Sequence, residues 1–202
     1  MDWVPTQPDA TRSTPFSAPR SDRQTIPSSS ISLTFSMMGG VAYSGDPRVA
    51  QLAERFWPGP LTLVLPARAV RPACRGLNTA GVRVPNHPIV LALLRAVSLP
   101  IAAPSANRSG WPSPTTAEDV LADLDGRIPL TLDGGPCHIG IESTVLDLSS
   151  PNAQVLRPGH ISAEAIAEAL GAPLSHAGAE AIRRSPGTRH PHYCASTPKL
   201  PH

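Results

Sequence analysis

The chain has 202 residues, of which 41% are hydrophobic and only 16% charged, with a formal net charge of +2. This composition predicts a globular core, and the near-neutral charge gives no basic signature of the kind that marks nucleic-acid-binding proteins. No apolar run approaches the ~20 residues of a membrane span, no secretory signal opens the chain, and three scattered cysteines favour a reducing, cytoplasmic location over a disulfide framework.

Composition divides the chain into three parts. Proline, serine and threonine make up half of residues 1–30, which predicts a disordered segment. Residues 46–171 alternate helical and strand patterns in the manner of an α/β domain. Residues 172–202 return to proline, histidine and serine, and predict a tail.

The central part predicts four helices and several short strands. An Asp46-Pro47 start, a capping-box spacing at Thr115 and Glu118, and a serine cap at Ser162 mark helix beginnings. The predicted helices cover residues 46–56, 87–97, 115–124 and 162–170. The predicted strands cover residues 61–65, 81–84, 101–103, 130–132, 143–148 and 155–156.

Polar clusters follow several of these strands. Residues 78–85, 103–110, 140–145 and 156–159 offer hydroxyls, amides and two arginines. Ligands of open α/β sheets bind at strand ends, and such donors suit a phosphate or a carboxylate. Each cluster also has a simpler interpretation, since an arginine at a strand end is more often a surface ion pair. For Glu142 and Asp147 we favour solvated or capping roles. Neither GxxxxGK[ST] nor GxGxxG occurs.

Five segments together carry a more specific signal: RFWPGPLTLVL (55–65), GVRVPNHP (81–88), APSANRSGWPSPT (103–115), GIESTVLDL (140–148) and VLRPG (155–159). In order and spacing they resemble the YrdC-like threonylcarbamoyl-AMP synthase family over residues 45–171. SPGTRHPHY (185–193) also resembles the linker that follows the catalytic domain in the long family members. The resemblance implies an α/β fold with a twisted, open, mixed sheet and flanking helices.

The resemblance also implies an activity. L-threonine, bicarbonate and ATP would give L-threonylcarbamoyladenylate and pyrophosphate, in a nucleotidyltransferase reaction that feeds tRNA modification. The implied partners are these substrates, the downstream threonylcarbamoyl-transferase machinery and tRNA. Mg²⁺ is expected on the ATP phosphates without a dedicated protein metal site.

Site residues follow from the matching positions. The resemblance assigns ATP binding to Thr79, Ser105, Asn107, Ser113 and Arg157. It assigns threonine binding to Arg83, Ala103 and Ser143. Arg83 and Arg157 would be the catalytic cations, because two anions must be held together while the transition-state charge is neutralised.

Residues 1–44 depart from the family pattern. They lack its threonine-binding Thr-x-Tyr-Gly segment and its Lys-x-Arg-Pro motif, so we expect one or more N-terminal strands to be missing. Read from the third base of each codon, DRQTIPSSSIS (22–32) can spell the family-like sequence Arg-Pro-Ala-Asp-Asn-Pro-Leu-Ile-Val-His-Leu. We therefore hypothesise that residues before about 40 are an out-of-frame translation, which sequencing of the locus tests.

Two other functions remain open at this point. The missing Lys-x-Arg motif favours a non-catalytic RNA-binding or regulatory module. A YrdC-like domain detached from a larger carbamoyl-transfer enzyme would act on a substrate other than threonine. Pyrophosphate release that depends on both threonine and bicarbonate would separate the synthase from both.

Overall fold

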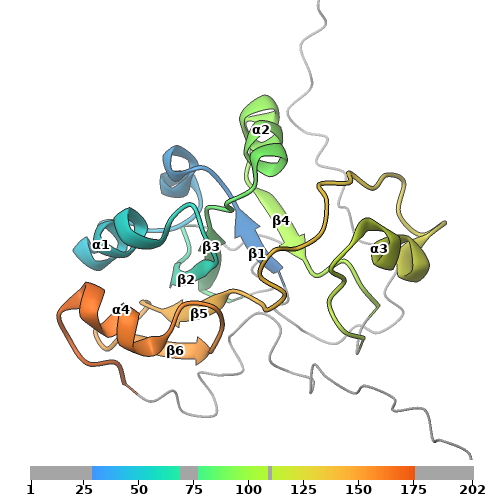
Figure 1. The fold of residues 1–202 in the computed structure, drawn as a ribbon. Helices are drawn as coiled ribbons and strands as arrows, with labels where there is room; N and C mark the ends of the chain where they lie inside the picture. Colours follow the sequence, from blue (N-terminus) through green and yellow to red (C-terminus); the bar gives the residue numbers. More distant parts are fainter. Residues whose placement is uncertain (1–28, 69–76, 109–110, 176–202) are drawn as a thin grey trace, which may run out of the picture.

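The computed structural model describes residues 29–68, 77–108 and 111–175. They contain a six-stranded mixed sheet in the order β4-β1-β3-β2-β5-β6 (Figure 1). Strands β1 and β3, and strands β2 and β5, pair in parallel, whereas the other neighbours are antiparallel. The strands are β1 (Ser29–Ser32), β2 (Leu61–Pro66), β3 (Thr79–Arg83), β4 (Ile101–Pro104), β5 (Thr144–Asp147) and β6 (Gln154–Arg157).

Four α-helices flank the sheet, as the sequence predicts. They are α1 (Pro47–Phe56), α2 (Pro88–Val97), α3 (Ala117–Leu124) and α4 (Ala163–Leu170). The predicted caps of α1 and α4 are confirmed, because Asp46 accepts from the Arg48 amide and Ser162 from the Ala165 amide. Figure 1 shows α1 and α4 together on one side of the sheet and α3 on the other.

The capping box of α3 lies one residue later than predicted. Thr116, not Thr115, is the N-cap, and its partner is Asp119, not Glu118. The Asp119 carboxylate accepts from the backbone amides of both Thr115 and Thr116, at 3.1 Å each. Because the Asp119 carboxylate accepts from both amides, the helix has its N-cap at Thr116, the later of the two threonines.

The N-terminal region departs from the expectation of disorder up to residue 44. Strand β1 lies inside the sheet between β3 and β4, and a 3-10 helix, η1 (Phe35–Gly40), follows it. Leu33, Met38 and Val41 are buried in the main core. These three apolar side chains, which lie within nine residues, bury enough apolar surface to order this segment, although the residues before it are rich in proline and serine. Residues 1–28 and 176–202, including most of the predicted tail and the linker-like segment, lie outside the described residues.

The strand predicted at residues 130–132 does not form. The segment has no regular secondary structure, and Leu130 and Leu132 are 71% and 58% exposed. No described strand lies beside it to supply backbone partners. A short apolar run without a neighbouring strand cannot satisfy its backbone groups as a strand does.

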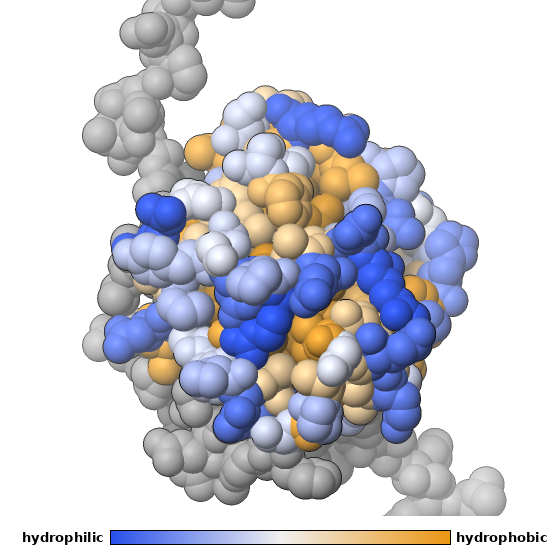
Figure 2. All heavy atoms as spheres, turned by 90° about the vertical axis from the view of Figure 1, so that its left-hand side faces the viewer, coloured by the Kyte–Doolittle hydropathy of each residue, from blue (hydrophilic) through white to orange (hydrophobic). Residues whose placement is uncertain are grey.

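The main core lies between one face of the sheet and helices α1 and α4. Residues that share this sheet face, such as Leu63, Val82 and Leu146, are completely buried. In α1 the apolar residues recur at helical spacing and face the sheet, namely Val49, Leu52 and Ala53. The outer surface of this side carries hydrophilic side chains broken by small apolar patches (Figure 2). None of the described helices is long and apolar enough to cross a lipid bilayer.

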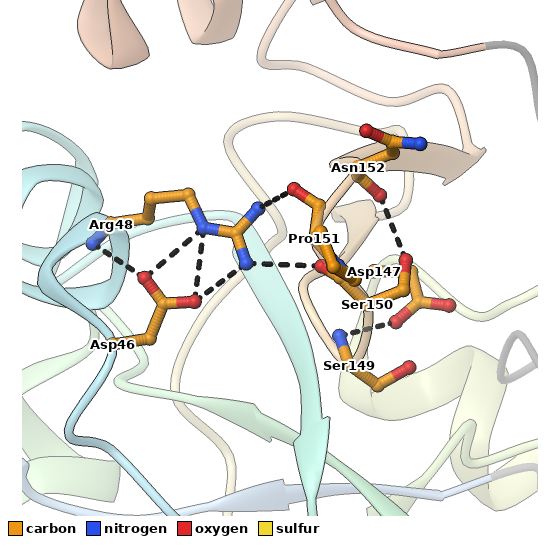
Figure 3. Close-up of polar contacts among 7 residues, drawn as sticks. All are labelled: Asp46, Arg48, Asp147, Ser149, Ser150, Pro151 and Asn152. Carbon is orange, nitrogen blue, oxygen red and sulfur yellow. Dashed lines mark hydrogen bonds and ion pairs between the residues drawn. The ribbon is translucent and has the colours of Figure 1, made fainter.

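One arginine joins the start of α1 to the turn between β5 and β6 (Figure 3). Arg48 contacts both carboxylate oxygens of Asp46, with Nη2 at 2.6 Å from Oδ2. It also donates from Nη1 to the carbonyl of Pro151 at 2.6 Å and from Nη2 to that of Ser150 at 3.0 Å. Asp147 shapes the same turn by accepting from the Ser149 amide, as its predicted capping role requires. The Arg48 clamp thus fixes the far end of the β5–β6 hairpin.

Candidate functional site

The candidate site lies on the sheet face opposite the main core. Strand register places its polar residues there, because residues opposite one another in a sheet share a face. Ser32 lies opposite Arg83, Ser30 opposite Ala103, and Gly81 opposite Val64. Alternate residues of a strand point to the same face, so Thr79 and Arg83 share the face of Gly81, and Thr62 shares the face of Val64. This face carries polar side chains beside a small buried apolar cluster of Val64, Val145 and Leu156, whereas the core face is aliphatic.

Arg83 is a partly buried cation. It ends β3, and its Nε atom is buried with no hydrogen-bond partner among the described residues. Burial lowers the pKa of Arg83 from its ordinary value, the nearby charge of Arg157 lowers it further, and Glu142 acts in the opposite direction. A buried donor without a partner on the protein suits a ligand that brings an acceptor.

Ser143 immediately precedes β5 and contacts Arg157. Its side chain is 6% exposed, and its Oγ lies 2.9 Å from Oγ1 of Thr62 on the neighbouring strand β2. Thr62 is itself only 1% exposed. The two hydroxyls therefore fix one another in the floor of the site, and sequence analysis did not single out Thr62. The sequence signal that could have identified Thr62 is that it is the polar residue inside the otherwise aliphatic strand LTLVL.

Arg157 ends β6 and lies against the 142–143 backbone. Its Nε and Nη2 donate to the Ser143 carbonyl at 3.1 and 2.9 Å, and Nη2 also donates to Ser143 Oγ at 3.1 Å. Its Nη1 forms an ion pair with Oε2 of Glu142. Oε1 of Glu142 accepts from the Ser113 hydroxyl at 2.9 Å. Glu142 is therefore neither solvated nor a cap, and that expectation is wrong, because both of its oxygens are held by site residues.

The turn after Arg157 has room only for glycine. A Cβ on Gly159 would collide with the backbone of Glu142, Ser143 and Thr144. The Thr144 hydroxyl holds the two segments together, since Oγ1 donates to the Ile161 carbonyl at 2.7 Å and accepts from the Ile161 amide at 3.0 Å. Close contact of the two backbones places Arg157 beside Ser143.

The remaining predicted residues lie on β3, on β4 and in the loop after β4. Thr79 is at the opposite end of β3 from Arg83, roughly 13 Å away for a four-residue strand separation. Ala103 lies on β4, and Ser105 follows that strand and is exposed. Asn107 is 9% exposed, and its Nδ2 donates to the carbonyls of Arg108 and Trp111, so it organises its own loop.

The structure thus brings together Arg83, Ser113, Ser143 and Arg157, with Glu142 and Thr62 as unforeseen members. Two guanidinium groups, two serine hydroxyls and one carboxylate make a site that can hold an anion and orient it. Among the described residues, no group of three or more His, Cys, Asp or Glu side chains could hold a metal ion.

The chain is similar in sequence to a known family and to several of its members. Residues 22–159 match the Sua5/YciO/YrdC family model, which carries the description "Telomere recombination". The chain is 49% identical over 155 residues to a threonylcarbamoyl-AMP synthase of Bacillus subtilis, and 46% identical over 151 residues to one of Pyrococcus abyssi. These matches cover 73% and 72% of this chain but only 44% of each relative, so the chain spans less than half the length of these curated relatives.

Solved structures agree with the fold. A crystal structure of Pyrococcus abyssi Sua5 complexed with L-threonine superposes with a TM-score of 0.73 at 40% identity, covering 82% of this chain and 51% of that chain. A second Pyrococcus abyssi Sua5 structure, of an H234A/Y235A variant, gives a TM-score of 0.71 at 43% identity, covering 75% of this chain and 45% of that one. The predicted α/β fold with a mixed sheet and flanking helices is confirmed, as is the predicted family resemblance.

Proposed function

The chain belongs to the Sua5/YciO/YrdC family, and on that premise we propose that it is the catalytic part of a threonylcarbamoyl-AMP synthase. The reaction would convert L-threonine, bicarbonate and ATP to L-threonylcarbamoyladenylate, pyrophosphate and water. The observation that supports this proposal most is the convergence of Arg83, Ser143 and Arg157 on one sheet face. Two cations side by side suit a site that holds two anionic substrates.

The chemistry needs positioning more than a covalent intermediate. The threonine amine adds to carbon dioxide, losing a proton, and gives a carbamate. A carbamate oxygen then attacks the α-phosphorus of ATP, and the bond to the bridging oxygen breaks as pyrophosphate leaves. Such phosphorus-centred transfer is accelerated mainly by alignment and by neutralising the spreading negative charge.

Threonine is assigned to the part of the site around Arg83. The guanidinium of Arg83 would bind the threonine carboxylate, using the Nε donor that lacks a protein partner. The Ser143 hydroxyl, fixed by Thr62, would bind a second polar group of the amino acid. The backbone of Ala103 would bound the pocket on the β4 side. Burial of Arg83 strengthens each of these charge-assisted contacts.

ATP is assigned to the part of the site around Arg157. Arg157 and Ser113, joined through Glu142, would contact the phosphates. Thr79, at the start of β3, and Ser105, just after β4, would contact the rest of the nucleotide. Asn107 would shape the nucleotide pocket through its loop, and its Oδ1 atom is buried without a described partner.

Mg²⁺ is proposed as part of the substrate rather than as a resident metal. Oxygen-rich phosphates retain Mg²⁺ with several water ligands, so no carboxylate cage is needed. We further propose that the product passes to threonylcarbamoyl-transferase machinery acting on tRNA, in the cytoplasm.

The test measures pyrophosphate release by the full chain with threonine, bicarbonate and MgATP. We expect release only when all three are present, and loss of at least about a hundredfold in Arg83→Ala or Arg157→Ala, the scale seen when one transition-state donor is removed. Release without threonine, or no release at all by folded protein, would contradict the proposal. RNA binding that persists in the Arg83→Ala/Arg157→Ala double variant without turnover would support a regulatory module instead.

A further inference from the structure

Glu142 joins two proposed nucleotide contacts that come from different parts of the chain. Its Oε1 accepts from Ser113, which precedes α3, and its Oε2 pairs with Arg157 at the end of β6. The two charged side chains are mostly enclosed, with 23% of Glu142 and 17% of Arg157 exposed. The carboxylate is therefore a bridge within the site.

The bridge controls the plane of the Arg157 guanidinium. The Ser143 carbonyl holds Nε and Nη2 on one edge. Glu142 holds Nη1 on the other. Contacts on two edges of a planar fork leave it a single orientation, whereas contacts on one edge allow it to swing. Removing the carboxylate would remove the Nη1 ion pair and weaken the hold of the Ser143 contacts on the guanidinium, so the bond from Nε to the Ser143 carbonyl would open more often.

The bridge also offsets repulsion between the two cations. Arg157 disfavours the charged form of buried Arg83, and Glu142 favours it, so the carboxylate compensates a like-charge contact in a poorly solvated site. A surface carboxylate would do this weakly, because water screens it. The enclosure of Glu142 makes the compensation effective.

We propose that Glu142 is a positioning residue that aligns Arg157 and Ser113 for the nucleotide. This inference rests on the proposed function and extends it to a residue outside the assigned ligand contacts. Its main effect falls on ATP, because its two oxygens bond to Ser113 and Arg157, the proposed nucleotide contacts, whereas it acts on Arg83 through its charge.

The experiment compares Glu142→Ala and Glu142→Gln with the matched control Glu168→Gln. Glu168 also pairs with an arginine, Arg55, but on the exposed outer surface of α4. We expect Glu142→Ala to raise the KM for ATP about tenfold and the KM for threonine less than about threefold, consistent with loss of a charge-assisted contact. Glu142→Gln should be intermediate, since its amide keeps one acceptor oxygen but replaces the other with an NH2 group, which cannot accept a hydrogen bond from Ser113 or Arg157. The control should match the wild type.

A second readout observes Arg157 directly. In ¹⁵N-labelled protein, the Nε–H signal of Arg157, identified by its loss in Arg157→Lys, should exchange with water about tenfold faster in Glu142→Ala than in the wild type. Unchanged exchange and unchanged ATP affinity would overturn the inference, as would tighter ATP binding, which would make Glu142 a competitor of the phosphates. Wild-type protein that fails to release pyrophosphate refutes the proposed function, and the Nε–H signal then still decides the role of Glu142.

Discussion

The Arg48 clamp gives a stability prediction that can be worked from the structure. Arg48→Met removes the ion pair with Asp46 and the bonds to two backbone carbonyls, those of Ser150 and Pro151. It retains the cap of α1, because that bond uses the backbone amide of residue 48. The substitution therefore separates the hairpin contact from helix capping.

The expected loss of unfolding free energy follows from the exposure of the Arg48 and Asp46 side chains. Side chains of Arg48 and Asp46 are 24% and 29% exposed, so the ion pair lies between the surface and buried cases. Each carbonyl bond contributes about 0.5 kcal/mol after competition with water, and the pair contributes about 0.5 kcal/mol, giving a loss of about 1.5 kcal/mol. With a urea m-value of about 2 kcal/mol/M, the midpoint should fall by about 0.7 M.

Urea denaturation followed by far-ultraviolet circular dichroism measures this loss, with Arg55→Met as the matched control. Arg55 also ion-pairs, but with 44% of its side chain and 70% of that of Glu168 exposed, so its removal should cost less than about 0.5 kcal/mol. A loss in Arg48→Met no larger than in Arg55→Met, at an unchanged m-value, would refute the reasoning that this clamp secures the hairpin.

Two further predictions concern the turn after Arg157 and the acid limit of stability. A Cβ in Gly159→Ala must displace backbone atoms rather than a flexible side chain, so we expect the ATP affinity to be at least about tenfold weaker when measured by calorimetry. Gly45→Ala is the control, because a Cβ there meets no other atom within 4 Å. Equal ATP affinities of the two variants would contradict the argument from close backbone contact. Hydrogen bonding to Arg48 lowers the pKa of Asp46 below its ordinary 3.8, so its stabilisation is complete above that value and disappears as the pH falls through the lower, folded-state pKa. The difference in unfolding free energy between wild type and Asp46→Asn should therefore stay constant from about pH 7 to 5 and shrink below about pH 4; a difference that shrinks already near neutrality would point to another group.

Much of the fold follows from local signals in the sequence. Proline after Asp46, and Ser162 with Gly171, mark α1 and α4 because caps and helix periodicity are local properties. Strand β1 escaped prediction because its position in the sheet depends on pairing with β3 and β4, which lie about 50 and 70 residues later in the chain. The out-of-frame origin of this region stays a prediction for sequencing.

The site was predictable in its residue types but not in its internal contacts. The family motifs pointed to Arg83, Ser143 and Arg157, which the structure gathers on one face. Glu142 was misjudged because its partner Arg157 lies on the next strand, and no spacing rule reports which carboxylate a distant arginine will meet. The roles of the individual ligand-binding residues remain proposals for the assays above.

The β5–β6 hairpin has a consequence for how ligands and local opening are coupled. Ser143 precedes one strand and Arg157 ends the other, and β6 lies at one edge of the sheet that the described residues form. If this margin detaches transiently, the proposed threonine contact of Ser143 and the proposed ATP contact of Arg157 are lost in the same event. Under the proposed function, a ligand bound at either contact therefore opposes the same fluctuation, and each ligand favours binding of the other by keeping this two-stranded unit closed.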